Sequence, residues 1–133
     1  QYDTIMTSII DTIKEKAGDN FYLLGVDDVD SELLEHEMAH GLYYTSADYK
    51  NKMDAITNSL PKEIFNGLKE IILSVGYTDF VVNDEIQAYV STGLHDKMKE
   101  IEGIDLYIDK YKDVFYSTLE KKEPIRIEIK YKD

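Results

Sequence analysis

Residues 33–40 read Leu-Leu-Glu-His-Glu-Met-Ala-His, and this stretch decides how the middle of the chain folds. Asp30 or Ser31 precedes it as a helix-capping residue, and glutamates occupy the first turn, where acidic side chains suit the helix dipole. The pattern predicts a helix from this cap to about Tyr44. Apolar residues on two opposite sides of the helix predict that it lies within the core.

The same stretch carries the motif His-Glu-x-x-His. His36 and His40 stand one helical turn apart and roughly 40° apart around the axis, so both imidazoles can reach one metal ion from the same face. Glu37 lies roughly 100° round from His36, where it flanks the ion and can take a proton from a metal-bound water. The chain has three histidines, and two of them occupy these positions. The pattern favours a metal site over two polar groups on a solvated helix.

A third ligand has to come from elsewhere in the chain, because a catalytic zinc site has three protein ligands and an open position for water. Ser46 stands where a third histidine would follow the motif in the metzincin pattern, so that pattern is excluded. Glu85, in the first turn of a later predicted helix, and His95, ten residues further on, remain as candidates. They stand roughly 15 Å apart along that helix and cannot both be ligands unless the helix breaks.

Glu85 is the preferred third ligand, because Ala88 and Thr92 are small and allow its helix to approach the motif helix closely. The other interpretation of Glu85 is an ordinary acid that stabilises the N-terminal end of its own helix. One zinc ion, held by His36, His40 and Glu85, is the expected cofactor.

Hydrophobic periodicity and turn residues predict a mostly helical α+β domain with a small sheet. Pro61 suits the first position of a helix, Gly76 ends that helix, and Gly103 separates the last two helices. Alternation of isoleucines with charged residues after Pro124 predicts a half-buried strand. The predicted helices cover about residues 2–16, 31–44, 46–58, 61–74, 83–101 and 104–119, and the predicted strands cover residues 21–26, 80–82 and 125–131.

The chain has 133 residues, a net charge of −12 and no cysteine. Its length fits a single domain over residues 1–133. The negative charge argues against nucleic acid or an anionic membrane as the main partner, and no apolar run reaches the ~18 residues of a membrane span. The lack of cysteine and of a visible signal peptide favours the cytoplasm. A start at Gln1 rather than Met leaves room for a processed or truncated product.

The motif at residues 36–40, together with Glu-Ile-Gln-Ala at residues 85–88, resembles the gluzincin group of zinc metallopeptidases. In size the chain is similar to the single-domain minigluzincins. The resemblance covers about residues 31–92 and implies a zincin-like domain with a central active-site helix. It also implies zinc on His36, His40 and Glu85, with Glu37 as general base, and a strand along which an extended peptide lies, for which residues 21–26 are the candidate.

The chain departs from this family at one position. Thermolysin-like members carry an aspartate four residues after the glutamate ligand, where it orients a zinc histidine, and this chain has Tyr89 there. Asp84, Asp79 or a backbone carbonyl is the candidate replacement.

A zinc-dependent peptidase acting on peptides or proteins is the leading functional hypothesis. Besides the metal, its tetrahedral intermediate needs a donor, for which Tyr43, Tyr44, Tyr89 and His95 are candidates. For any single tyrosine, core packing is the favoured interpretation, and for His95 a surface position is favoured. A second hypothesis is a zinc-stabilised interaction module that descends from a peptidase without catalysing a reaction. The third is an acidic binding module, which the scattering of acids among bases disfavours. The sequence leaves the substrate and the oligomeric state open.

Overall fold

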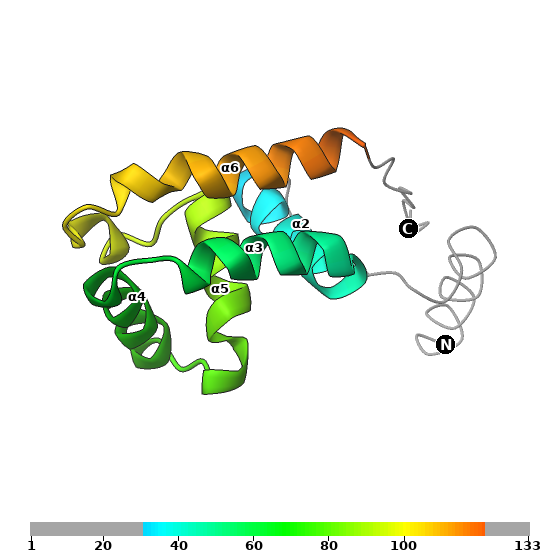
Figure 1. The fold of residues 1–133 in the computed structure, drawn as a ribbon. Coiled ribbons are helices and arrows are strands. Elements are labelled where there is room, and N and C mark those ends of the chain that lie inside the picture. The colour runs from blue at the N-terminus through cyan, green and yellow to red at the C-terminus, as the bar shows by residue number, and fades with distance from the viewer. Residues whose placement is uncertain (1–30, 122–133) are drawn as a thin grey trace, which may run out of the picture.

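The computed structural model describes residues 31–121, and every element in this range is a helix (Figure 1). The α-helices are joined by short turns, two of which contain a 3-10 helix, labelled η. The elements in chain order are α2 (Ser31–Thr45), α3 (Ala47–Asn58), α4 (Lys62–Ser74), η1 (Asp79–Val81), α5 (Val82–Thr92), η2 (Met98–Glu100) and α6 (Asp105–Glu120).

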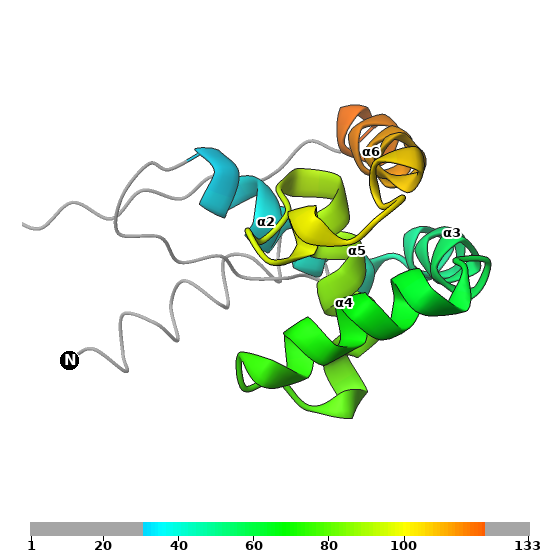
Figure 2. The ribbon, with the colours of Figure 1, turned by 90° about the vertical axis from the view of Figure 1, so that its left-hand side faces the viewer.

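Helix α5 occupies the centre of the arrangement. It packs against α2, α3, α4 and α6, and Figure 2 shows these four helices around it. Residues 85–88 and 90–92 of α5 are all buried, which fits a helix covered on most sides. The sequence predicted a central motif helix, α2, within the core. Helix α5 takes the central position instead, while Ala39 and Leu42 of α2 belong to the core. Leu33 of α2 is 49% exposed, so only part of this apolar helix is covered by its neighbours.

The core consists of the inward faces of α2, α3, α4, α5 and α6. Met53 of α3 and Leu68 and Ile72 of α4 are fully buried. Helix α6 buries Tyr111 and Phe115, which lie one turn apart on one face. Gly76 has φ +106°, a left-handed conformation that favours glycine, and it follows the end of α4 as predicted.

The prediction of an α+β fold with a small sheet is wrong for the part of the chain described, because residues 31–121 contain no strand. The predicted strand at residues 80–82 is helical: Phe80 and Val81 belong to η1, and Val82 begins α5. Two acids in the first turn stabilise a helix at this point, and Phe80 is 99% exposed, unlike a buried strand residue. The predicted helix 2–16 and the predicted strands 21–26 and 125–131 lie outside the described residues.

The predicted helix 83–101 is also too long. Helix α5 ends at Thr92, and Gly93 follows it with extended backbone. Glycine is a weak helix former, and the helix ends at this position, so His95 lies outside α5. Over the described range, no helix combines the length and apolar composition that crossing a bilayer requires.

Candidate metal centre

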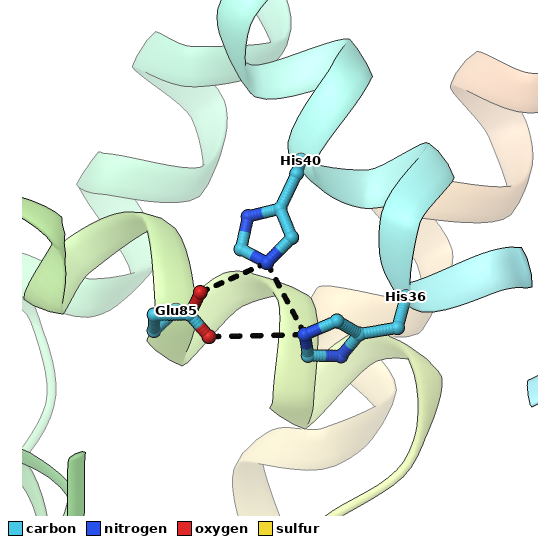
Figure 3. A group of neighbouring side chains, drawn as sticks. All are labelled: His36, His40 and Glu85. Carbon is cyan, nitrogen blue, oxygen red and sulfur yellow. Dashed lines mark hydrogen bonds and ion pairs between the residues drawn. The ribbon is translucent and has the colours of Figure 1, made fainter. Parts of the chain in front are cut away.

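Helices α2 and α5 bring together three side chains that could hold a metal ion (Figure 3). His36 and His40 come from α2, and Glu85 comes from the first turn of α5. His40 Nε2 lies 2.9 Å from Glu85 Oε1 and 3.2 Å from His36 Nε2, and His36 Nε2 lies 3.7 Å from Glu85 Oε2. One ligand atom from each residue falls within 4.8 Å of the others. The structure thus brings together the three ligands predicted from the sequence.

Local structure explains why these side chains meet. The i, i+4 spacing places both imidazoles on one face of α2, and Figure 3 shows both rings directed toward Glu85. Ala39 on α2 and Ala88 on α5 are fully buried, and small side chains allow two helices to pack closely. Ala88 and Thr92, whose small size was expected to allow a close approach of the two helices, are both buried.

The group is largely removed from solvent. Glu85 is 5% exposed and His40 is buried, while His36 is half-buried. Glu85 Oε2 is buried and accepts no hydrogen bond. A buried carboxylate oxygen without a partner is costly, and a cation satisfies it together with the two imidazole nitrogens. The donor set and this unsatisfied oxygen fit a bound metal ion.

Asp84 orients His40 from the side opposite the ligand atom. His40 Nδ1 donates a hydrogen bond to Asp84 Oδ1 at 2.9 Å. A neutral imidazole that donates from Nδ1 keeps its lone pair on Nε2, the atom that faces Glu85. Among the three replacements considered from the sequence, the geometry selects Asp84. Asp79 instead forms an ion pair with Lys69, at 3.6 Å.

The charges of the group are strongly coupled. Burial alone would lower the pKa of His40, but hydrogen bonds and charge from Asp84 and Glu85 outweigh it and raise the pKa to about 10. Burial alone would raise the pKa of Glu85, but His36 and His40 outweigh it and lower the pKa to about 2. Without a metal ion, the protein therefore holds a protonated His40 against an ionised Glu85 at neutral pH.

This coupling predicts how the stability of the metal-free protein depends on pH. The pKa of His40 rises from 6.5 to about 10 on folding, so its stabilisation is complete below pH 6.5 and disappears as the pH rises through 10. The pKa of Glu85 falls from 4.5 to about 2, so its stabilisation is complete above pH 4.5 and disappears as the pH falls through 2. We expect urea denaturation with chelator present to give the greatest stability between pH 4.5 and 6.5.

The control for this prediction is His40→Gln, which removes the titrating imidazole. The free energy of unfolding of this variant should change much less between pH 6.5 and 10 than that of the wild type. An equal decline in both proteins would contradict the role of His40. Metal affinity should follow the opposite trend and increase with pH, because protons compete with the ion for the same nitrogen.

One of the four predicted donor residues, Tyr89, packs on a metal ligand, and a second, His95, lies next to Tyr89. The ring of Tyr89 packs edge-on against that of His36, with centroids 4.6 Å apart, and the ring of His95 lies 6.4 Å from that of Tyr89. Burial, together with Tyr77 and Glu85, raises the pKa of Tyr89 to about 12, so its hydroxyl keeps its proton at neutral pH. Tyr77 was not among the predicted site residues, because it lies in the turn after α4, where no periodicity indicates its contact with Tyr89.

The other two predicted donors are directed elsewhere or exposed. The Tyr43 hydroxyl donates to Asp54 Oδ1 at 2.7 Å, and its ring lies against the ammonium of Lys50. Tyr44 is 71% exposed. Glu37 follows His36 on α2 and is half-buried, and it does not belong to the three-residue group that could hold the ion.

Comparisons of the chain with protein-family models, curated proteins and solved structures find no match. The resemblance to gluzincins thus rests on the sequence motif, and the geometry defines a class of site, a candidate metal centre of two imidazoles and one carboxylate.

Proposed function

We propose that the protein is a zinc-dependent peptidase that hydrolyses peptide bonds in peptide or protein substrates. One observation carries the proposal: two imidazole nitrogens from one helix meet a buried carboxylate from another, and one oxygen of that carboxylate has no hydrogen-bond partner. The motif that supplies the imidazoles also supplies Glu37, which is not among the metal-capable residues.

The donor set favours zinc over magnesium and calcium. Zinc binds imidazole and carboxylate ligands, and two histidines with one glutamate form a common catalytic zinc site with a position left for water. Magnesium and calcium prefer sites made of oxygen ligands. When bound, zinc supplies a Lewis acid that polarises a peptide carbonyl and lowers the pKa of water toward neutrality.

The chain's own residues supply the remaining chemistry. Glu37 accepts a proton from the attacking water and passes it to the leaving amine as general base and then general acid. Tyr89, which packs on His36 and keeps its hydroxyl proton, is the nearer of the two donor candidates for the developing oxyanion, with His95 beyond it. Asp84 holds His40 in the orientation that directs Nε2 to the ion.

Removal and return of the metal test this proposal. We expect the full chain to cleave members of a mixed peptide library, detected by mass spectrometry as new termini, and to lose this activity on treatment with a chelator. One equivalent of zinc should restore it, whereas magnesium should not. Cleavage that persists after complete removal of metal would contradict the proposal.

The alternative of a zinc-stabilised interaction module makes a different prediction in the same experiment. Such a module takes up zinc and unfolds more easily with chelator, but it cleaves no peptide at any zinc concentration. Zinc uptake without cleavage across the library would replace the peptidase by this module. If the chain neither took up zinc nor cleaved peptides, the assignment of a metal centre would be wrong.

A further inference from the structure

Two fully buried polar side chains stand behind the metal ligands without belonging to them. Gln87 of α5 and Tyr49 of α3 are each 0% exposed. The Tyr49 hydroxyl donates to Gln87 Oε1 at 2.6 Å, and Gln87 Nε2 donates to Asp84 Oδ1 at 2.9 Å. The same Asp84 oxygen accepts the hydrogen bond from His40 Nδ1. A continuous path of hydrogen bonds therefore runs from Tyr49 in the core to the imidazole ring of His40.

The amide of Gln87 can occupy this position in only one orientation. Its nitrogen also donates to the backbone carbonyl of Ala39 at 3.0 Å, so both amide protons are used. Both groups on that side, Ala39 O and the Asp84 carboxylate, are acceptors, and a flipped amide would place its oxygen against them. With the amide nitrogen directed at these two acceptors, its oxygen faces the Tyr49 hydroxyl, which donates to it. The direction of every hydrogen bond in the path is thereby fixed.

Gln87 also connects the three helices on which the site depends. It belongs to α5, accepts from α3 and donates to α2 at Ala39, the residue directly before His40. Asp84 is partly exposed and could adopt other rotamers if Gln87 did not hold it. A buried amide between an aspartate and a metal ligand's helix restricts both of them at once.

We propose that Gln87, supported by Tyr49, is a positioning residue that holds Asp84 on His40 Nδ1 and so sets how tightly the centre binds its metal. We call this path the Tyr49–Gln87–Asp84 relay. The inference rests on the metal site of the proposed function and does not depend on peptide hydrolysis. Loss of the hydrogen-bond partner of a metal-ligating histidine typically weakens metal affinity about 10- to 100-fold. The relay extends this effect to Gln87 and Tyr49, which do not contact His40 themselves.

The test measures zinc affinity by competition with a chromophoric chelator. We expect Gln87→Met, which keeps the size of the side chain and removes its hydrogen bonds, to raise the zinc Kd about 10- to 100-fold. Tyr49→Phe, which removes one supporting hydrogen bond, should raise it about three- to tenfold. Tyr49→Phe keeps the shape of the core, so it provides the test if Gln87→Met does not fold.

Tyr111→Phe is the matched control. Tyr111 is also fully buried, and its hydroxyl is hydrogen-bonded to Thr57 at 2.9 Å, outside the relay. We expect Tyr111→Phe and Tyr49→Phe to lower the Tm of the metal-free protein similarly, while Tyr111→Phe leaves the zinc Kd within about twofold of the wild type. Equal effects of the two variants on zinc affinity would reduce Tyr49 to an ordinary core residue and overturn the relay.

A double-mutant comparison shows whether Gln87 acts through Asp84. In an Asp84→Ala background, adding Gln87→Met should change the zinc Kd by less than about twofold, although it still lowers the Tm. An undiminished effect in that background would overturn the relay. Tight zinc binding without peptide cleavage would refute the peptidase alone and leave the relay standing, whereas a wild-type chain that takes up no zinc would refute both.

Discussion

Glu37→Gln is expected to abolish peptide hydrolysis while leaving zinc binding intact. General base and acid catalysis by a carboxylate contributes about 10²- to 10⁴-fold, and an amide of the same size cannot accept the water proton. Glu37 lies outside the group that could hold the ion, so its replacement removes no ligand. Initial rates on a peptide found by library screening, together with metal analysis of the purified variant, measure both effects.

The control for this experiment is Glu35→Gln, which makes the same change of charge two residues earlier on α2. Glu35 accepts a hydrogen bond from the Tyr116 hydroxyl at 2.5 Å, and glutamine keeps an oxygen that can accept it. We expect its activity to stay within a few-fold of the wild type. A Glu37→Gln protein that cleaves as fast as Glu35→Gln would contradict the assigned catalytic role.

Glu85→Ala is expected to remove most of the zinc affinity. The substitution takes away the only carboxylate of the three-residue group and leaves two imidazoles, fewer than the three protein ligands of a catalytic zinc site. Zinc at about 100 times its Kd stabilises a protein by about 2.7 kcal/mol, and we expect this increment in the wild type but not in the variant. Thermal denaturation with and without zinc measures the difference.

Glu63→Ala separates this role from an effect on the helix dipole. Glu63 is an acid in the first turn of α4, as Glu85 is in α5, but it is exposed and far from the histidines in sequence. If Glu85 served only its helix, both variants would lose about 0.3–1 kcal/mol of stability and keep the zinc increment. Retention of full zinc stabilisation by Glu85→Ala would show that the third ligand is another residue.

Most of the helical fold was predictable because its signals are local. Ser46 caps α3 by accepting a hydrogen bond from the backbone N–H of Tyr49, and Pro61 directly precedes α4. Tyr111 and Phe115 stand at helical spacing within the predicted helix 104–119, and both are buried in α6. Such features depend on residues within one or two turns, so a single sequence reveals them.

The errors concern α5, where local signals conflicted. Phe80, Val81 and Val82 form a short apolar run typical of a strand, but the acids that follow favour a helix, and the helix prevails. Gly93 is a helix-breaking residue, but the predicted helix 83–101 ran past it, whereas α5 ends at Thr92. The central position of α5 depends on contacts with four other helices, which periodicity along one helix does not reveal.

In the candidate site too, the residues placed by local sequence were predictable and those placed by tertiary packing were not. The motif spacing alone places His36 and His40 together, because both lie on one helix. The selection of Asp84 over Asp79 required the tertiary structure, as did the finding that Tyr43 donates to Asp54. Asp84, Asp79 and Asp54 lie outside the motif helix, so which side chain each of them contacts follows from tertiary packing rather than from the motif.

X-ray absorption spectroscopy at the zinc edge of the full chain, loaded with one equivalent of zinc, tests the metal centre most directly. We predict an ion with two imidazole nitrogens in its coordination shell, from His36 and His40, and oxygen ligands in the remaining positions. A shell with one imidazole or none would contradict the assignment of both histidines, and with it the proposed chemistry.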